Sequence, residues 1–248
     1  MRTDLSIGSR DRSLHGSNHL VNIGAMPVLT RPATAAKPRV RLARPTRDAE
    51  RTQATILDAA TAEFARHGLG GARVDRIAER AKTNKRMLYY YFGGKDALFL
   101  AALERAYEHI RSEEQGLHLT DLMPAEGVRQ LIVFTWNYYL AHPEFMTLLN
   151  SENLHRAQHL KRSKKIRAMH SPLIAMLSEV LSRGVRDGVF RKGVDPVQLY
   201  VSIAALGYFY LSNSYTLSTV FGRDLLATRA KAERLAHIND LVQRYLAR

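Results

Sequence analysis

The sequence predicts an all-α protein, and three observations lead to this prediction. Apolar residues recur at three- and four-residue spacing over most of the chain after residue 48, and no apolar–polar alternation is long enough for a strand. Proline or glycine punctuates the helical segments. With 248 residues, 46% hydrophobic and 24% charged, the chain has an ordinary globular composition and the length of one large or two modest domains.

Cysteine content and apolar run length narrow the class of protein. The sequence contains no cysteine, which excludes disulfides, cysteine nucleophiles and iron–sulfur clusters, and makes the reducing cytoplasm the expected compartment. The longest apolar stretches, residues 131–141 and 199–211, are shorter than the roughly 18 residues of a membrane-spanning helix, so no membrane partner is predicted. The net charge of +14 instead favours a polyanionic partner.

Half of this net charge lies in residues 1–47, which contain nine basic and two acidic residues. Within this segment, residues 31–47 hold six basic residues, three prolines and almost none of the large apolar residues that a core needs. Residues 1–47 are therefore predicted to form a disordered basic arm. They lack the continuous apolar segment of a signal peptide, and Met26 leaves open whether residues 1–25 are translated.

Three helices are expected at the start of the ordered chain. Apolar residues from Ile56 to Phe64 share one face of a first helix, which His67 and Gly68 end. A short second helix covers residues 74–81, and a third covers residues 85–92 after the capping pair Thr83 and Asn84.

The third helix has two chemically different faces. At 100° per residue, Leu88 and Phe92 point inward, whereas Arg86 and Tyr90 point to the opposite side. Two short helices joined by a tight turn, the second presenting arginine and aromatic side chains, are typical of a helix-turn-helix that enters the major groove. Residues 73–95 contain seven basic and two acidic residues, which fits a phosphate-facing surface. Periodicity alone leaves open an ordinary solvated surface.

The segments ILDAATAEFARHG, VDRIAERAKTNKRMLYYYF and GGKDALF, in this order within residues 56–99, resemble the N-terminal domain of the TetR/AcrR family of bacterial transcriptional regulators. The resemblance implies a helix-turn-helix DNA-binding domain over residues 48–110 and a helical domain for effector binding and dimerisation over residues 111–248. The later residues resemble the family only in helical pattern and length.

The resemblance also implies roles for individual residues. Lys85, Arg86, Met87 and Tyr90 fall where members of the family read base edges, and Tyr89, Tyr91 and Lys95 fall where members hold phosphates. The full set predicted to bind DNA is Arg73, Thr83, Asn84, Lys85, Arg86, Met87, Tyr89, Tyr90, Tyr91 and Lys95. One departure is that Lys82-Thr83-Asn84 replaces the usual Gly-Val-Ser of the turn, so a left-handed glycine is missing while Asn84 keeps the capping role.

Six further helices are expected, over residues 94–114, 125–141, 143–169, 172–187, 196–220 and 225–247. Two stripes on the last two helices predict a dimer interface formed by Ala204, Gly207, Leu211, Leu235, Ile238, Val242 and Tyr245. The alternative is that both stripes pack into their own subunit. The resemblance favours a homodimer, because members pair through their final helices and read palindromic operators.

Glu152, His155 and His159 would lie on one face if residues 143–169 form a single helix. This spacing leaves three alternatives: a metal site, polar groups lining a pocket, or ordinary hydrogen bonding. The sequence offers no assured fourth ligand, phosphate loop or nucleophile elbow. It therefore predicts no enzyme activity, catalytic residue, metal or cofactor.

Aromatic and amide residues within apolar stretches are candidates for binding a small planar effector. They are Trp136, Tyr139, Asn150, Asn153, His155, Tyr208 and Asn213. Trp136 and Tyr139 are equally well interpreted as core aromatics.

Together these features predict a cytoplasmic, nucleoid-associated DNA-binding regulator, a repressor of an adjacent operon that an unknown small molecule releases. Effector binding would tilt the fourth helix and change the separation of the two recognition helices. The alternative is a constitutive DNA-coating protein that uses the same helix-turn-helix without an effector.

Overall fold

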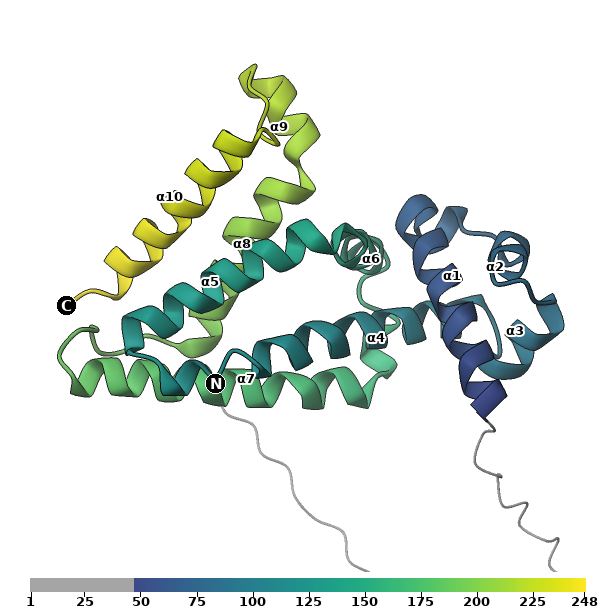
Figure 1. Cartoon of the computed structure of the whole chain (residues 1–248), viewed down its shortest axis with the longest axis horizontal. Helices are drawn as coiled ribbons and strands as arrows, with labels where there is room; N and C mark the ends of the chain where they lie inside the picture. The colour runs from purple at the N-terminus through teal and green to yellow at the C-terminus, as the bar shows by residue number, and fades with distance from the viewer. Residues whose placement is uncertain (1–46) are drawn as a thin grey trace, which may run out of the picture. The chain divides into compact units, whose positions relative to one another are not determined.

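The computed structural model describes residues 47–248, so the predicted basic arm lies outside the described residues except for Arg47. Within this range the chain forms ten α-helices and two short 3-10 turns, with a single isolated bridge between Phe190 and Ala247 and no strand (Figure 1). The predicted all-α fold is confirmed. The helices are α1 (Arg47–Gly71), α2 (Val74–Arg80), α3 (Lys85–Phe92), α4 (Lys95–Gln115), α5 (Pro124–Ala141), α6 (Pro143–Leu154), α7 (Lys164–Arg186), α8 (Pro196–Ser212), α9 (Ser214–Phe221) and α10 (Thr228–Leu246).

Helices α1 to α3 and the start of α4 enclose a first hydrophobic core. Ile56, Phe64, Ile77, Leu88 and Phe99 are all fully buried in it. The regular part of α1 ends at Gly68, whose φ of 62° and ψ of 178° suit glycine, and this confirms the predicted helix stop. The chain then turns into the α2–α3 pair, and the helix-turn-helix expected from the sequence is present.

The turn between α2 and α3 has Lys82 where the family resemblance leads us to expect a glycine. Lys82 itself takes the left-handed conformation, with φ of 50°. The Asn84 side chain accepts a hydrogen bond from Met87 N at 3.0 Å, so the predicted N-cap is confirmed. Gly93, with φ of 78°, ends α3.

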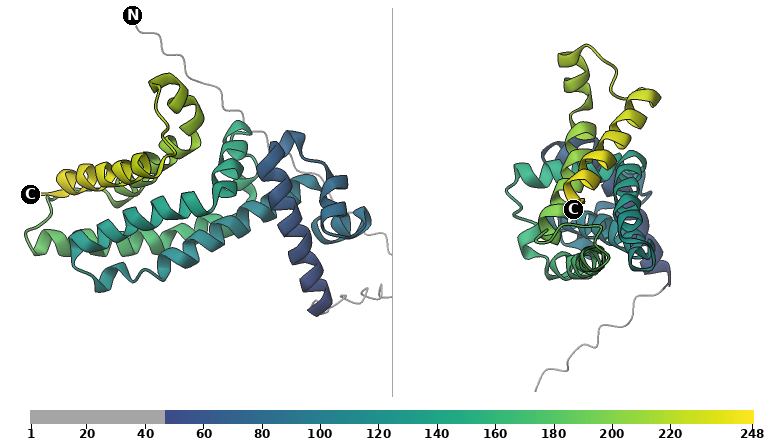
Figure 2. Two further views of the ribbon diagram at one scale, coloured as in Figure 1. Left: turned by 45° about the horizontal axis from the view of Figure 1, so that its top comes forward. Right: turned by 90° about the vertical axis from the view of Figure 1, so that its left-hand side faces the viewer.

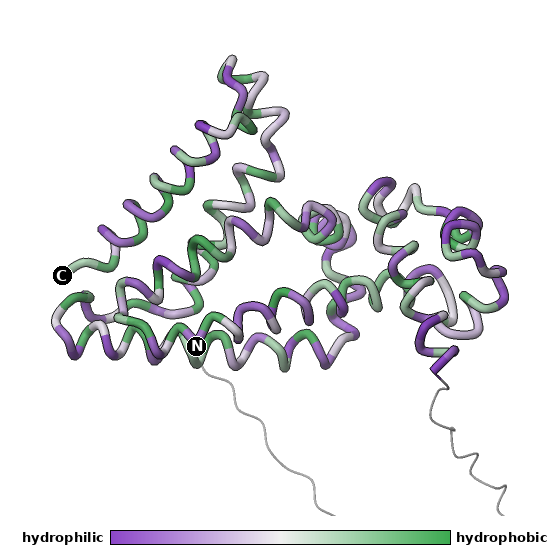
Figure 3. Tube along the Cα trace, in the orientation of Figure 1, coloured by the Kyte–Doolittle hydropathy of each residue, from purple (hydrophilic) through white to green (hydrophobic). Residues whose placement is uncertain are grey.

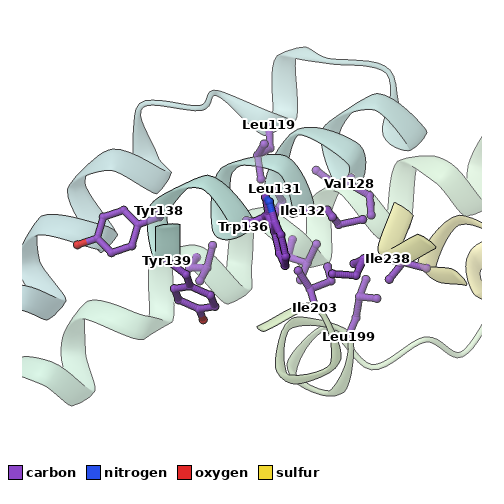
Figure 4. Packing of buried hydrophobic residues seen from close by; sticks show 14 of the residues in the cluster. Leu119, Val128, Leu131, Ile132, Trp136, Tyr138, Tyr139, Leu199, Ile203 and Ile238 are labelled. Atoms are coloured by element: carbon purple, nitrogen blue, oxygen red, sulfur yellow. The ribbon is translucent and has the colours of Figure 1, made fainter. Parts of the chain in front are cut away.

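A second hydrophobic core lies among α4, α5, α7, α8 and α10. Trp136, Leu131 and Ile132 of α5 face Ile203 and the neighbouring residues of α8 and α10 (Figure 4). Hydrophobic and hydrophilic residues alternate along α10, as expected for a helix with one buried face (Figure 3).

Three predicted helix boundaries are wrong. The helix expected over residues 143–169 ends at Leu154, and Arg156 and Ala157, with φ of 55° and 57°, form a left-handed turn. Helix α7 then runs from Lys164 through Pro172 instead of beginning there. The helix expected over residues 196–220 breaks at Asn213 into α8 and α9.

The structure buries several residues of the predicted dimer stripes inside the protomer. Leu211, Ile238 and Val242 are 7%, 1% and 2% exposed within a single protomer, so these side chains are not available to a partner. A Cβ atom on Gly207 would lie 3.5 Å from Tyr139 and 3.7 Å from Trp136, which means that this glycine admits the protomer's own aromatic residues. Leu235 packs against the same core, Ala204 is half-buried, and Tyr245 is exposed.

Helix α6 connects the two cores. Leu148 is fully buried in the first core, alongside residues of α1 and α4. The Ser151 hydroxyl accepts a hydrogen bond from Leu69 N at 3.1 Å, just after the kink in α1. Figure 1 and the left view of Figure 2 show α6 beside α1. A movement of α6 therefore bears directly on the helix that supports α2 and α3.

Candidate DNA-binding interface and ligand cavity

Helix α3 presents its polar and aromatic side chains to solvent and buries Leu88. Tyr90 is 78% and Tyr89 51% exposed, and Arg86 is also exposed, while Leu88 is completely buried. This is the orientation that the helical periodicity predicted. A buried leucine fixes how the helix sits on its domain, so Arg86 and Tyr90 project away from the core, and the Tyr90 ring packs only edge-on against Tyr91 with ring centroids 5.1 Å apart.

A buried carboxylate holds α2 against α1. Glu63 of α1 is 2% exposed, and its Oε1 atom accepts hydrogen bonds from Arg73 N at 3.0 Å and Arg76 Nε at 2.7 Å. Arg76 also donates to Gly71 O at 2.9 Å. This clamp fixes the entry into α2 and hence the position of α3 behind it. Neither Glu63 nor Arg76 was among the residues predicted from the sequence to form the site.

The remaining residues predicted to bind DNA surround α3. Lys85 forms a salt bridge with Asp75, and Lys95 Nζ donates to Gly70 O at 3.4 Å. Arg73 is exposed, and Thr83, Met87 and Tyr91 are partly exposed. Every member of the predicted set is therefore accessible on one helix-turn-helix unit, although Asn84 uses its side-chain oxygen as a cap.

A cavity of about 440 Å³ lies among α4, α5, α6, α7 and α8. Its wall combines aromatic side chains with a few polar groups. It is lined by Tyr107, Arg111, Tyr139, Phe145, Leu149, Glu152, Asn153, Leu160, His170, Tyr200, Val201, Ala204, Ala205 and Tyr208.

Three of the residues predicted to bind an effector line this cavity: Tyr139, Asn153 and Tyr208. The other four do not, which corrects the predicted set. Trp136 is 3% exposed and packs against Tyr210 with ring centroids 5.7 Å apart. Asn150 accepts a hydrogen bond from Tyr208, the His155 ring contacts Ser151 O at 2.7 Å, and Asn213 donates to Phe209 O at 3.0 Å.

Arg111, the charged group of the cavity, was not among the residues predicted to bind an effector. It lies on the buried side of α4 with Ile110 and Glu114. The available signal for Arg111 was a charged residue within a helical stripe that is otherwise apolar. Tyr107 and Tyr200 were missed because they reach the cavity from helices far apart in the sequence.

Burial shifts the pKa of several groups around Arg111. It raises the pKa of Glu114 to about 7, although Arg111 opposes this, and raises the pKa of Tyr107 to about 12. Burial also raises the pKa of Tyr200 and lowers that of His170. At neutral pH the tyrosines are therefore neutral hydrogen-bond donors and His170 is neutral.

Glu152 and His159 do not share a helix face, because α6 ends before His155. The turn nevertheless brings them together, with Glu152 Oε2 2.7 Å from His159 Nδ1. Glu152 Oε1 accepts hydrogen bonds from His159 N at 2.8 Å and Leu160 N at 2.9 Å. Among the described residues no group of three His, Cys, Asp or Glu side chains could hold a metal ion.

The His159 ring also reaches the first core. It lies edge-on to Phe99, with ring centroids 5.1 Å apart, and Phe99 packs in the same way on Phe64. Glu152 and Leu160 line the cavity, so one cluster touches both the cavity and the core beneath α3.

In residues 47–248, no helix is long and apolar enough to cross a membrane.

Comparisons with known proteins agree with this architecture. The sequence profile of bacterial regulatory proteins of the tetR family matches residues 56–102, and that of the tetracyclin repressor-like C-terminal domain matches residues 124–242. The chain is 40% identical over 200 residues to the HTH-type transcriptional repressor NicS of Pseudomonas putida, covering 81% of this chain and 94% of that protein. It is 40% identical over 108 residues to the repressor SCO4008 of Streptomyces coelicolor, covering 44% of this chain and 53% of that protein.

Solved structures show the same fold. The transcriptional regulator SCO4942 of Streptomyces coelicolor aligns with a TM-score of 0.59 at 27% identity, over 79% of this chain and 98% of that one. A regulator of Saccharomonospora viridis, solved in complex with choline, aligns with a TM-score of 0.62 at 18% identity, over 80% and 99% of the two chains, and bears on the fold alone. Helix-turn-helix geometry, sequence profiles and a relative aligned over nearly its full length agree: this chain is a DNA-binding transcriptional regulator of the tetR family.

Proposed function

We propose that the chain is a repressor that binds a palindromic operator as a homodimer and leaves it when a small molecule occupies the cavity among α4 to α8. The observation that carries the DNA-binding part is the orientation of α3, with Leu88 buried and Arg86 and Tyr90 projecting outward. An arginine so placed can chelate guanine O6 and N7 in the major groove. The whole accessible set around α3 remains our candidate for the DNA contacts.

The cavity favours this function over constitutive DNA coating. A coating protein needs no cavity, whereas this one has aromatic walls and a buried guanidinium. Two relatives are named as transcriptional repressors, which supports repression of transcription as the function of this chain.

The coupling between cavity and DNA runs through α4 and the α6–α7 turn. Tyr107 and Arg111 line the cavity from α4, the helix that also supplies Leu98 and Phe99 to the first core. Glu152 and Leu160 line the opposite wall and hold His159 on Phe99. A ligand that separates these walls would move α4 and α6 together and change the position of α3.

The partner surface for a dimer lies on the outer faces of α8, α9 and α10. Val197, Val201, Ala205 and Phe209 follow one another at four-residue spacing on α8, and all are exposed. Two of them, Val201 and Ala205, also line the cavity. Large apolar side chains continue this face on the next two helices, and they are Tyr215, Val220, Phe221, Leu241 and Tyr245. Large exposed apolar side chains concentrated on neighbouring helices are typical of a protein–protein interface. We propose this surface as the isologous contact of a two-fold dimer.

We further propose that residues 48–110 form a DNA-binding domain and that residues 111–248 form an effector-binding and dimerisation domain. The basic arm adds affinity for DNA without adding sequence specificity. Deleting residues 1–46 is expected to weaken operator and nonspecific binding by similar factors and to reduce the slope of log K against log salt by about 0.9 per lost phosphate contact. An unchanged slope would contradict the role of the arm. The site of action is the nucleoid in the bacterial cytoplasm.

The proposed function is tested by selecting bound duplexes from a random library with the purified full-length chain, then transcribing a promoter that carries the selected site. We expect an inverted repeat to be enriched and transcription to fall when the protein is added. Failure to enrich any sequence, or unchanged transcription from the selected site, would contradict a sequence-specific repressor.

A further inference from the structure

Resting on the proposed function, we infer that the effector is a small aromatic carboxylate, held with its carboxylate on Arg111 and its ring between the aromatic side chains of the cavity. The chemical class follows from hydrogen bonds that the cavity leaves unmade and from the shape of its walls.

Arg111 is buried without a full set of acceptors. Its side chain is 4% exposed, and Nη2 donates to the Tyr200 hydroxyl at 2.6 Å. Nε and Nη1 are both buried and make no hydrogen bond. Orphaned donors on a buried charge are costly, and because Arg111 lines the cavity, a small turn of the guanidinium toward an anionic acceptor there would satisfy them with strong, charge-assisted hydrogen bonds.

Glu114 does not fill this role. Its Oε2 lies 2.8 Å from Arg111 Nη1, but neither of its oxygens accepts a hydrogen bond, so the two groups are close without being aligned. Glu114 does not line the cavity, whereas Arg111 does. Since burial also raises the pKa of Glu114 to about 7, this carboxyl is only partly ionised at neutral pH and compensates the guanidinium incompletely. An anion entering the cavity therefore meets residual positive charge.

The second carboxylate of the region is already satisfied. Glu152 lines the cavity, but its oxygens accept from His159 N, His159 Nδ1 and Leu160 N. It offers no free acceptor to a cationic ligand. His170, on the α7 side, is kept neutral by a lowered pKa that arises from burial. The charge available to a ligand is thus that of Arg111.

The walls around Arg111 suit a flat ring. Tyr107 stands edge-on to Phe145 with ring centroids 5.6 Å apart, and Tyr139 lies nearly parallel to Phe145 at 6.2 Å. Aromatic pairs prefer such edge-to-face and offset-stacked arrangements, which a further ring can join. The volume of about 440 Å³ admits a molecule of one or two rings. Neutral phenolic hydroxyls on Tyr107 and Tyr139 can donate to ring substituents.

Calorimetric titration of the full-length protein tests the inference with pairs of probes that differ only in charge. The probes are benzoate with benzamide and 1-naphthoate with 1-naphthamide, each tried up to about 5 mM, and cyclohexanecarboxylate serves as the non-aromatic acid. At least one aromatic acid is expected to bind about tenfold or more tightly than its amide and than the non-aromatic acid. Equal binding of acid and amide, or no binding of either acid, would overturn the inference.

Two variants assign the binding to Arg111. Arg111→Met, which keeps the length of the side chain, is expected to lose about tenfold or more in affinity for the acid and none for the amide. Glu114→Gln is expected to strengthen acid binding several-fold at pH 8, because it removes the competing carboxylate, and this variant keeps the test open if Arg111→Met does not fold. Arg234→Met, which alters an arginine outside the cavity, is the matched control. Unchanged acid affinity in both Arg111→Met and Glu114→Gln would overturn the inference.

Operator binding separates this inference from the proposed function. Wild-type protein that binds a selected duplex but none of the acids would refute only the effector class. Protein that binds no duplex specifically would refute the repressor itself, whatever the calorimetry gives.

Discussion

Glu152 Oε2 lies 2.7 Å from His159 Nδ1, and both side chains are about 2% exposed although the turn after α6 separates them in sequence. The Glu152 carboxylate also accepts the backbone N–H groups of His159 and Leu160. One carboxylate therefore adds side-chain acceptors to a left-handed turn whose backbone hydrogen bonds include Ala157 N to Glu152 O at 3.0 Å. Because His159 packs on Phe99 and Glu152 lines the cavity, this contact joins the two halves of the protein.

Replacing Glu152 by alanine should loosen this turn. Each buried donor left without an acceptor costs about 1–3 kcal/mol, so we expect the free energy of unfolding in urea to fall by at least about 2 kcal/mol. Hydrogen exchange at His159 N and Leu160 N should accelerate. Leu154→Ala, at a residue that is 83% exposed on the same helix, is the control. Unchanged exchange at these two amides would show that the turn is held by other contacts.

The exposed face of α8 should decide the oligomeric state. Val197→Glu combined with Phe209→Glu places two carboxylates on this face and is expected to give a monomer in sedimentation velocity, with weak binding to an operator half-site. Asn137→Glu, at an exposed position of α5, should leave the dimer intact. An intact dimer for the double variant would remove α8 from the interface. Gly207→Leu, by contrast, should destabilise each protomer, since Tyr139 and Trp136 occupy the space.

Glu114 should make stability fall as pH rises through neutrality. Burial raises its pKa from 4.5 to about 7, so the folded protein holds a proton that the unfolded chain has released. The stabilisation is fully present below pH 4.5 and is lost as pH rises through about 7. The groups that face it are Arg111, Tyr138, Tyr139 and Tyr200. The tyrosines stay neutral over this range, because burial raises the pKa of each.

Urea unfolding of wild type and Glu114→Gln between pH 5 and 8 isolates this contribution. The difference between the two proteins is expected to change by about 2–3 kcal/mol across the range, with the variant gaining on wild type at higher pH. His170, whose pKa is lowered by burial, destabilises both proteins alike on acidification and cancels in the difference. A constant difference would mean that Glu114 titrates normally.

The DNA-binding half could be predicted from the sequence because its determinants are local. Leu88 and Phe92 lie one turn apart, Asn84 caps the helix that follows it, and Gly68 ends the helix that precedes it. Lys82 is the exception, because nothing in the sequence marks a lysine that adopts the left-handed conformation. The absence of the usual glycine showed only that the geometry of this turn was not determined by the sequence.

The cavity could not be predicted in the same way, because its residues converge from five helices and one 3-10 turn. Arg111, Tyr139 and Tyr200 have no sequence relationship that periodicity can detect. The end of α6 was missed because no glycine or proline follows Leu154, and the turn is held by Glu152 instead. The sequence could not place the residues of the predicted dimer stripes for a related reason. Periodicity finds an apolar face but does not tell whether the protomer or its partner covers it, and here Ile238 and Val242 face inward.

The most direct test of the account is the affinity of wild type, Arg86→Ala, Tyr90→Ala and the exposed control Arg167→Ala for a selected operator and for a scrambled duplex, measured by fluorescence anisotropy at one salt concentration. Arg86 and Tyr90 project from α3 on the side opposite Leu88, so their loss should cost about 1–3 kcal/mol of discrimination each without changing the thermal midpoint. Arg167→Ala should preserve discrimination. If both α3 variants distinguish operator from scrambled duplex as well as wild type does, α3 is not the reading helix and the central claim is wrong.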